Sequence, residues 1–139
     1  MWTQSHTIVT KKATREQLWK LFANVNQWST WDEGVEYAKM DGRFEKGNFF
    51  VLKPKGGPKV KIQLIEAIEN KGFTDLTRFP LAKMYGEHIF EDTTEGVKIT
   101  TTMKVEGPLG FLWRKLVAQN IANALPAEME QQVNHASKL

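Results

Sequence analysis

The sequence of 139 residues contains no cysteine. This absence excludes disulfide bonds, a thiol nucleophile and any cysteine-ligated metal site. The sequence also lacks an apolar run near the roughly 20 residues that a membrane-spanning helix needs, so we expect neither stable membrane insertion nor a signal peptide. Together these absences favour a cytoplasmic protein.

Sequence motifs for cofactors and metals are missing as well. The three histidines, His6, His88 and His135, are scattered along the chain, and no HExxH or similar ligand spacing occurs. Neither a GxGxxG stretch nor a P-loop is present, and no serine lies in a nucleophile elbow. We therefore expect no metal site and no cofactor.

The charged residues show no concentration of one sign. The net charge is +3, and the 19 Lys and Arg residues are interspersed with 16 Asp and Glu residues. A nucleic-acid binder usually gathers its basic residues on one face. The densest basic stretch, "KPKGGPKVK", is more typical of a solvated hairpin turn than of a phosphate-binding patch, so we expect no nucleic-acid partner.

Helical periodicity occurs in two segments. The first contains Leu18, Leu21, Phe22 and Val25 on one stripe, preceded by Thr14 with the spacing of a capping box. "VNQWSTW" then predicts one further helical turn. The second segment covers almost thirty residues near the C-terminus, with a proline expected to kink or reset the helix; its apolar stripe consists of Leu109, Leu112, Trp113, Leu116, Val117, Ile121 and Leu125.

A period of two dominates the rest of the chain. Residues 2–10 predict a first strand, and six further strands follow residue 34: "VEYAKM", "NFFVLK", "KVKIQLIEAI", "GFTDLTRF", "MYGEHIFED" and "VKITTTMKVE". Glycine- and proline-containing turns separate them. Residues 1–139 therefore predict one α+β domain, in which the terminal helix covers one face of a seven-stranded antiparallel sheet. The space between helix and sheet is the expected ligand site.

Hairpin turn lengths predict which side chains face this space. The turn at 93–96 pairs Phe90 with Ile99 and His88 with Thr101. The next turns place Asp75 opposite His88 and Glu66 opposite Asp75. The predicted polar row across the inner face is therefore Glu66, Asp75, His88 and Thr101, with neighbours about 5 Å apart.

The polar row has a chemical interpretation and a structural one. Asp75 could hold the imidazole of His88 in one tautomer, so that His88 acts as a general base. A buried His–Asp pair can equally be a structural network, and a β-bulge would turn Glu66 or Asp75 outward. The sequence leaves these alternatives open.

The remaining inner positions predict an apolar ligand site. Methionine and phenylalanine adapt to ligands of varied shape. The expected apolar contacts are Phe49, Val51, Ile62, Leu64, Phe73, Phe79, Met84, Phe90, Ile99 and Met103. Trp28 and Trp31, three residues apart, are expected to anchor the helices to the sheet edge, with Trp31 as a candidate for the cavity rim and Asp32 turning the chain into the next strand.

The segments "ATREQLWKLFANVNQWSTWDEGV", "GRFEKGNFFVLKP" and "FPLAKMYGEHIFEDTTEGVKITTTMKVEGPLG", together with the terminal helix, resemble the polyketide cyclase/dehydrase branch of the helix-grip superfamily. That superfamily includes the steroidogenic acute regulatory protein-related lipid transfer (START) domains and the Bet v 1 allergens. The resemblance implies a curved seven-stranded sheet wrapped around a long C-terminal helix, with two short helices between the first two strands. It also implies a cavity for hydrophobic or amphipathic molecules. It transfers no catalytic set, because the catalytic residues vary between branches.

Two functions follow as hypotheses. The first is binding of a small hydrophobic or amphipathic molecule in the cavity. The second is a cyclase or dehydratase-type lyase in which His88 and Asp75 transfer protons. A third hypothesis is a protein-interaction module that forms a homodimer through Ile65, Leu76 and Ile89, which are expected to be exposed on the outer face of the sheet.

Overall fold

The computed structural model describes residues 1–139. Its seven strands are β1 (Trp2–Thr10), β2 (Val35–Lys39), β3 (Phe49–Pro54), β4 (Val60–Ile68), β5 (Gly72–Phe79), β6 (Ala82–Thr93) and β7 (Gly96–Glu106). The helical elements are α1 (Arg15–Ala23), the 3₁₀ helix η1 (Val25–Thr30), α2 (Gly110–Trp113), the π-helical η2 (Arg114–Ala118) and α3 (Gln119–Ala136).

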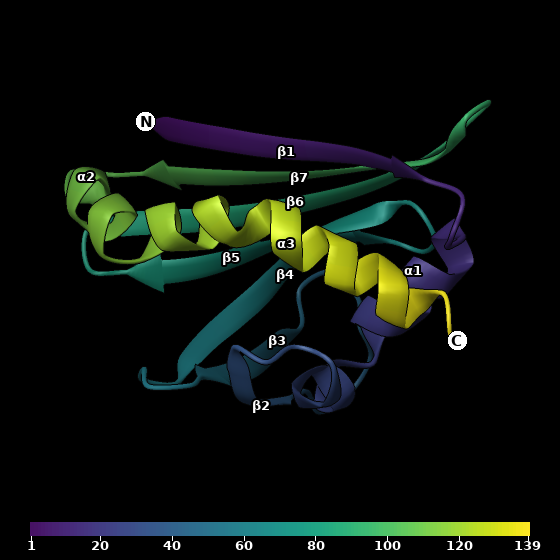
Figure 1. Ribbon diagram of the computed structural model, residues 1–139. Helices are drawn as coiled ribbons and strands as arrows, with labels where there is room; N and C mark the ends of the chain where they lie inside the picture. The colour runs from purple at the N-terminus through teal and green to yellow at the C-terminus, as the bar shows by residue number, and fades with distance from the viewer.

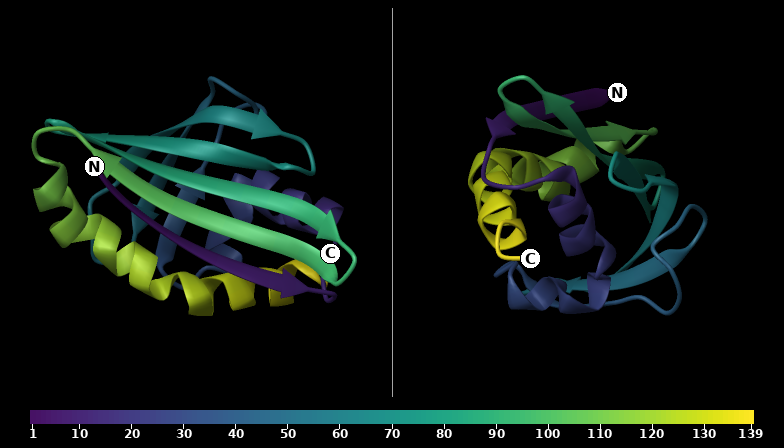
Figure 2. Two further views of the ribbon diagram at one scale, coloured as in Figure 1. Left: turned by 90° about the horizontal axis from the view of Figure 1, so that it is seen from above. Right: turned by 90° about the vertical axis from the view of Figure 1, so that its right-hand side faces the viewer.

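All seven strands form one antiparallel sheet in the order β1-β7-β6-β5-β4-β3-β2. The sheet curves, and α3 crosses its concave side (Figure 1). The end-on view in Figure 2 shows α1 on the same concave side. The predicted α+β helix-grip architecture is thereby confirmed.

The predicted cap of α1 is confirmed. The Gln17 backbone N–H donates to Thr14 Oγ1 at 3.1 Å, and the Thr14 N–H donates to Gln17 Oε1 at 2.9 Å. These two bonds satisfy backbone donors that the first helical turn cannot pair internally. The helix thus begins where its apolar stripe, with buried Leu18, Leu21 and Phe22, can pack under the sheet.

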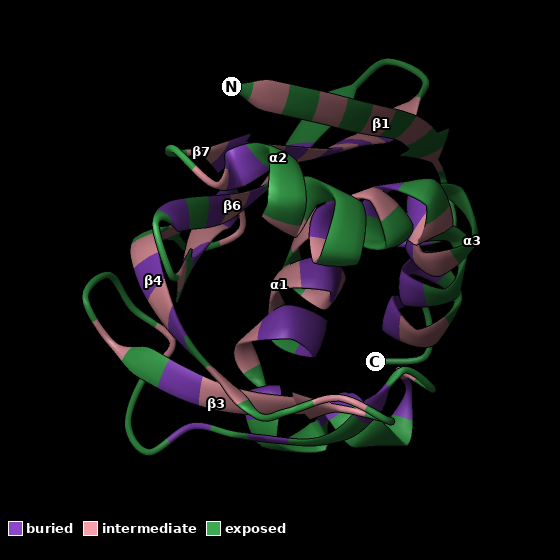
Figure 3. Cartoon of the chain, turned by 90° about the vertical axis from the view of Figure 1, so that its left-hand side faces the viewer, coloured by how far each residue is buried: buried purple, intermediate pink, exposed green.

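The C-terminal helical stretch differs in one respect from its prediction. Pro126 lies inside α3, which continues without a break from residue 119 to residue 136, so the proline does not reset the helix. The irregularity lies earlier, at the π-helical turn of residues 114–118. Figure 3 shows buried positions on the side of α3 that faces the sheet and exposed positions on its other side.

The hairpin of β6 and β7 has its predicted register. Phe90 pairs with Ile99, and His88 pairs with Thr101. The β5–β6 register is displaced by two residues, because the connecting turn contains only Pro80 and Leu81. A displacement by two leaves every side chain on its predicted face, since the side-chain period of a strand is two.

The β4–β5 pair departs from its prediction through a β-bulge. Leu64 pairs with Asp75, but Glu66 pairs with Thr74, so Ile65 is an extra residue on β4. Beyond the bulge, alternation is reversed. The prediction that Glu66 lies opposite Asp75 on the inner face was therefore wrong, and Glu66 points to the outer face.

The β3–β4 register also differs, by one residue. Ile62 pairs with Phe50, and Val60 pairs with Leu52, whereas the predicted inward placement of Phe49 and Val51 requires the odd-numbered residues of β3 as their partners. A shift of one exchanges the two faces of a strand. Phe50 and Leu52 consequently point inward, and the inward placement predicted for Phe49 and Val51 was wrong.

The core lies between the sheet and the helices, where 26 buried apolar residues form one cluster. Leu76, predicted as an exposed contact on the outer face, is buried. No helix is long and apolar enough to cross a membrane. No group of three or more His, Asp or Glu side chains is arranged to hold a metal ion.

Candidate functional site

A cavity of about 720 Å³ lies between the concave side of the sheet and the terminal helix. Its volume is in the range of sites for small molecules, about 300–1,000 Å³. Most of its wall is apolar, with contributions from Trp28, Phe50, Leu52, Val60, Ile62, Phe79, Met84, Met103, Leu116, Val117, Ile121 and Leu125. The prominent polar groups in the wall are Lys55, Asp75, Thr77, His88, Thr101, Asn120, Glu128 and Gln132.

The structure brings about half of the predicted site residues to this cavity. Seven of them line it: Ile62, Asp75, Phe79, Met84, His88, Thr101 and Met103. They come from β4, β5, β6 and β7, whose inward faces converge under α3. Of the predicted polar row, Asp75, His88 and Thr101 therefore line the same cavity, and Glu66 does not.

The other predicted residues lie elsewhere. Leu64, Phe73, Phe90, Ile99 and Trp31 are buried in the core cluster and do not line the cavity. On the outer side of the sheet, Phe49 is 40% exposed, and the ammonium of Lys61 lies 4.6 Å from its ring centroid. Glu66 Oε2 lies 3.9 Å from Lys46 Nζ. The structure thus removes Phe49, Val51 and Glu66 from the candidate site.

Asp75 and His88 approach each other diagonally across β5 and β6. Asp75 pairs with Gly86 rather than with His88, and His88 pairs with Phe73. His88 Nε2 nevertheless lies 3.6 Å from Asp75 Oδ2. This separation exceeds that of an N–H···O hydrogen bond, about 2.7–3.2 Å, so both groups keep hydrogen-bonding capacity for a third partner.

The imidazole of His88 is fixed by aromatic packing. It stacks on the Phe73 ring, with the centroids 4.3 Å apart and the planes 15° from parallel. The Phe22 ring of α1 packs beside it at 5.5 Å. The imidazole therefore packs against two aromatic rings that also contact each other, and it lies beside Asp75.

Thr101 completes the polar group on the sheet. It is the cross-strand partner of His88, and only 2% of its surface is exposed. Its Oγ1 atom is buried and has no hydrogen-bond partner. A buried hydroxyl without a partner costs free energy, typically about 1–3 kcal/mol, so this atom needs a partner from the cavity.

Sequence reasoning missed the polar residues that α3 contributes. Asn120, Glu128 and Gln132 line the cavity together with Val117, Ile121 and Leu125. Their spacing of three and four residues from apolar neighbours was the available signal, because positions i, i+3, i+4 and i+7 share one helix face. Polar residues on an otherwise apolar stripe mark the side of α3 that faces the ligand space.

Among the cavity-lining residues, Glu128 has the most strongly shifted pKa. Burial raises the pKa of its carboxyl from the ordinary 4.5 to about 7, and the negative charge of Asp32 adds to this. Burial likewise raises the pKa of Asp32, while the hydrogen bond from the Gly34 backbone N–H to Asp32 Oδ1, 2.9 Å long, opposes the increase. Lys55, at the mouth of the cavity, also lowers the pKa of Asp32. Near neutral pH, Glu128 thus exists in both protonation states.

Trp28 and Trp31 occupy different positions relative to the cavity. Both are buried, and both pack edge-on against Phe22. Trp28 lines the cavity, and its Nε1 donates to the Phe22 carbonyl at 3.0 Å. Trp31 lies in the core, so the tryptophan in the cavity wall is Trp28 and not Trp31. The predicted turn at Asp32 is present, through its bond to Gly34.

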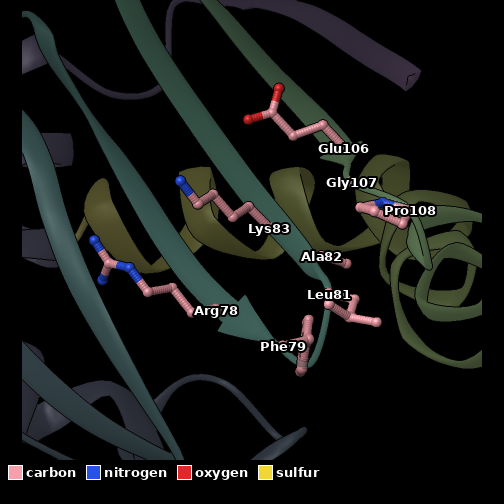
Figure 4. A pocket seen from close by; sticks show the side chains of 8 residues that line it. All are labelled: Arg78, Phe79, Leu81, Ala82, Lys83, Glu106, Gly107 and Pro108. Carbon is pink, nitrogen blue, oxygen red and sulfur yellow. The ribbon is translucent and has the colours of Figure 1, made fainter.

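A second hollow, at the β5–β6 turn, is more open and contains three charged side chains. Arg78, Lys83 and Glu106 form a cross-strand row, and Figure 4 shows them on the side of the sheet away from the terminal helix. Phe79 is shared with the central cavity. Its ring stacks on Trp113 at 4.5 Å, and Trp113 Nε1 donates to the Pro80 carbonyl at 2.9 Å. These contacts fix the start of the terminal helix on the turn.

The sequence matches the family described as "Polyketide cyclase / dehydrase and lipid transport" over residues 1–136. The chain belongs to this family, as the resemblance of its segments implied. No curated protein matches the sequence.

Solved structures with the same fold share little sequence with the chain. Ara h 8.0201, a Bet v 1-type structure, is 11% identical with a TM-score of 0.74, covering 99% of each chain. A START superfamily protein from Mycobacterium smegmatis is 16% identical with a TM-score of 0.65, covering 93% of this chain and 97% of its own. The di-domain ARO/CYC StfQ from the steffimycin biosynthetic pathway is 14% identical with a TM-score of 0.72; 98% of this chain covers 50% of that one. At these identities the likeness establishes the fold.

Proposed function

We propose that the chain binds a small hydrophobic or amphipathic molecule in the cavity between the sheet and α3. The observation that supports this most is the cavity itself, with its volume of about 720 Å³ and its mostly apolar wall. An apolar wall with a few polar groups is typical of sites that bury a ligand and fix its orientation. The family description, which includes lipid transport, supports the same function.

Nile red, an uncharged apolar dye, tests this proposal. Its emission should shift to shorter wavelength and increase when the dye enters the cavity, and the melting temperature should rise by mass action. Ile121→Trp should weaken dye binding about tenfold or more, because Ile121 lines the cavity and is 37% exposed at its rim. Ile68→Trp, at an exposed position outside the cavity, is the matched control. Equal dye affinity in both variants would contradict the proposal.

The second candidate function is a lyase of the dehydratase type. The approach of His88 Nε2 to Asp75 Oδ2, at 3.6 Å within the cavity wall, favours it. His88 would take the proton from the carbon next to a ketone carbonyl, and the neighbouring hydroxyl would leave with that proton as water. The reaction needs no cofactor.

A β-hydroxyketone made from benzaldehyde and acetone tests the lyase. Loss of water gives benzalacetone, which absorbs in the near ultraviolet. His88→Gln should lower the rate to that of the uncatalysed reaction, whereas His135→Gln, outside the cavity lining, should not change it. A wild-type rate equal to the uncatalysed rate argues for binding alone. A cytoplasmic location and a homodimer stay predictions.

A further inference from the structure

We infer that the polar group on the sheet, formed by Asp75, His88 and Thr101, recognises a hydroxyl group on an uncharged ligand and discriminates against carboxylates. This inference rests on the proposed binding function and specifies the ligand class. The ligand would be a phenol or alcohol whose apolar body fills the rest of the cavity. Free fatty acids and other apolar carboxylates would be poor ligands.

The first argument is the hydrogen-bonding capacity left open at this point. Thr101 Oγ1 is buried without a partner. His88 Nε2 and Asp75 Oδ2 are 3.6 Å apart, and neither side chain forms a hydrogen bond within the protein. Three polar side chains from neighbouring strands therefore face the cavity with unmet donors and acceptors. Buried polar groups in proteins are nearly always paired, which points to a partner that enters from the cavity.

The second argument is the chemical type of these groups. A carboxylate only accepts hydrogen bonds, whereas a threonine hydroxyl both donates and accepts. A ligand hydroxyl can donate to Asp75 and accept from Thr101 at the same time. A ligand carboxylate can only accept, so it would satisfy Thr101 but would face the Asp75 carboxylate without a proton to share.

The third argument is the balance of charge around the cavity. The wall contains two acidic side chains, Asp75 and Glu128, and its only lysine is Lys55 in the β3–β4 connection. No arginine lines the cavity. A ligand carboxylate would therefore face two carboxylates against one lysine, and that lysine already interacts with the charge of Asp32, so the anion would be poorly compensated. A cationic ligand would meet the imidazole of His88 next to Asp75, whereas an uncharged hydroxyl can bond to Asp75 and Thr101 without the cost of burying a charge.

The residue opposite Asp75 leaves space for its carboxylate next to the cavity. Asp75 is the cross-strand partner of Gly86. A Cβ atom at residue 86 would lie 3.0 Å from both carboxylate oxygens of Asp75. The missing side chain at Gly86 thus leaves room for the carboxylate to lie against the sheet, next to His88 and beneath the cavity.

Displacement of Nile red by four probes of one shape tests the inference. The probes are β-naphthol, β-methylnaphthalene, β-naphthoic acid and β-naphthylmethylamine, measured at neutral pH. We expect β-naphthol to bind about tenfold tighter than β-methylnaphthalene, equivalent to about 1.4 kcal/mol. We expect the ionised β-naphthoic acid to bind more weakly than both. Equal affinities for the first two probes, or tightest binding of the acid or the amine, would overturn the inference.

Two variants link the preference to its residues. Thr101→Val keeps the shape of the side chain and removes the hydroxyl, so the tenfold preference for β-naphthol should fall to threefold or less, while β-methylnaphthalene binds as before. Thr100→Val, the neighbouring residue on the outer face, is the matched control. An unchanged preference in Thr101→Val would also overturn the inference.

The outcomes separate this inference from the proposed function. If Nile red binds and Ile121→Trp weakens it, the cavity is the binding site whatever the four probes show. If no probe prefers the hydroxyl in that case, only the hydroxyl recognition is wrong. If neither Nile red nor any naphthalene probe binds, both the proposed function and the inference are wrong.

Discussion

Asp75 and Gly86 are cross-strand partners on the inner face of the sheet, and both carboxylate oxygens of Asp75 lie 3.0 Å from the position that a Cβ at residue 86 would take. His88, two residues further along β6, shares this face, so the carboxylate reaches the imidazole diagonally. The absence of a side chain at residue 86 thus leaves the Asp75 carboxylate free of a close contact at this position. Gly86 consequently belongs to the candidate site, although it supplies no functional group.

Gly86→Ala should weaken ligand recognition and also lower stability slightly. The new Cβ would lie 3.0 Å from both Asp75 oxygens, and the flexible carboxylate can move away from it. We expect a loss of about 1 kcal/mol in the free energy of unfolding, at the low end of overpacking effects. We also expect a several-fold weaker affinity for β-naphthol. Urea unfolding and dye displacement measure the two effects.

Gly110→Ala is the matched control for this substitution. A Cβ at residue 110 would lie 3.5 Å from Val105 Cγ1, an ordinary contact, and the residue begins α2. Alanine favours a helix over glycine by up to about 1 kcal/mol. Gly110→Ala should therefore leave stability unchanged or raise it, and leave naphthol affinity as it was. Loss of affinity in Gly110→Ala but not in Gly86→Ala would contradict the role assigned to Gly86.

Glu128→Gln should stabilise the protein at alkaline pH. The pKa of Glu128 is raised by folding from the ordinary 4.5 to about 7, so the unfolded chain releases this proton more readily than the folded one. The contribution of the group to stability is then fully present below about pH 4.5 and is lost as the pH rises through about 7. Above pH 7, we expect the variant to exceed the wild type by about 1 kcal/mol, a value reduced for partial exposure. Near pH 4.5 the two should unfold alike.

The measurement is urea unfolding at several pH values between 4.5 and 8.5. Glu130→Gln, on the exposed side of the same helix, is the control and should show no such pH-dependent gain. Asp32→Asn should reduce the gain from Glu128→Gln, because the charge of Asp32 contributes to the raised pKa of Glu128. A gain that appears at low pH and vanishes at high pH would contradict the prediction.

Trp28→Phe should destabilise the protein more than Trp31→Phe. Both rings are buried to a similar extent, so the loss of apolar area is comparable. Trp28 Nε1 donates a hydrogen bond to the Phe22 carbonyl at 3.0 Å, whereas Trp31 Nε1 is buried without a partner. Trp31→Phe removes a buried donor that has no partner and so removes its desolvation cost, whereas Trp28→Phe removes a hydrogen bond. We therefore expect the free energies of unfolding of the two variants to differ by about 1–2 kcal/mol. Equal urea midpoints for the two variants would exclude this explanation.

The β6–β7 hairpin and the cap of α1 could be predicted because each depends on residues close in sequence. Phe90 and Ile99 are joined by a short turn, and Thr14 and Gln17 are three residues apart. The bulge at Ile65 leaves no such local signal, because it depends on how β4 pairs with β5. The β3–β4 register was missed for the same reason, since the length of that connection does not determine its path.

The site was predicted where it lies on the sheet and missed where it lies on the helix. Alternation identified His88 and Thr101 as inward-facing, and the turn at Pro80 kept Asp75 on that face despite its displacement by two residues. Glu128 was missed because its chemistry comes from burial and from the charge of Asp32, which is almost a hundred positions away in the chain. Such effects follow from the tertiary structure and not from residue spacing.

The bulge on β4 has a consequence for insertions and deletions. Ile65 has no partner on β5, so β4 contains one residue more than the ladder requires. Deleting Ile65 would restore a regular ladder without moving Leu64 off the inner face or Glu66 off the outer face. Deleting a residue from the fully paired strand β7 would instead turn part of that strand over and put lysine and threonine side chains into the core. A deletion at this extra residue of β4 should therefore be tolerated better than a deletion in a regularly paired strand such as β7.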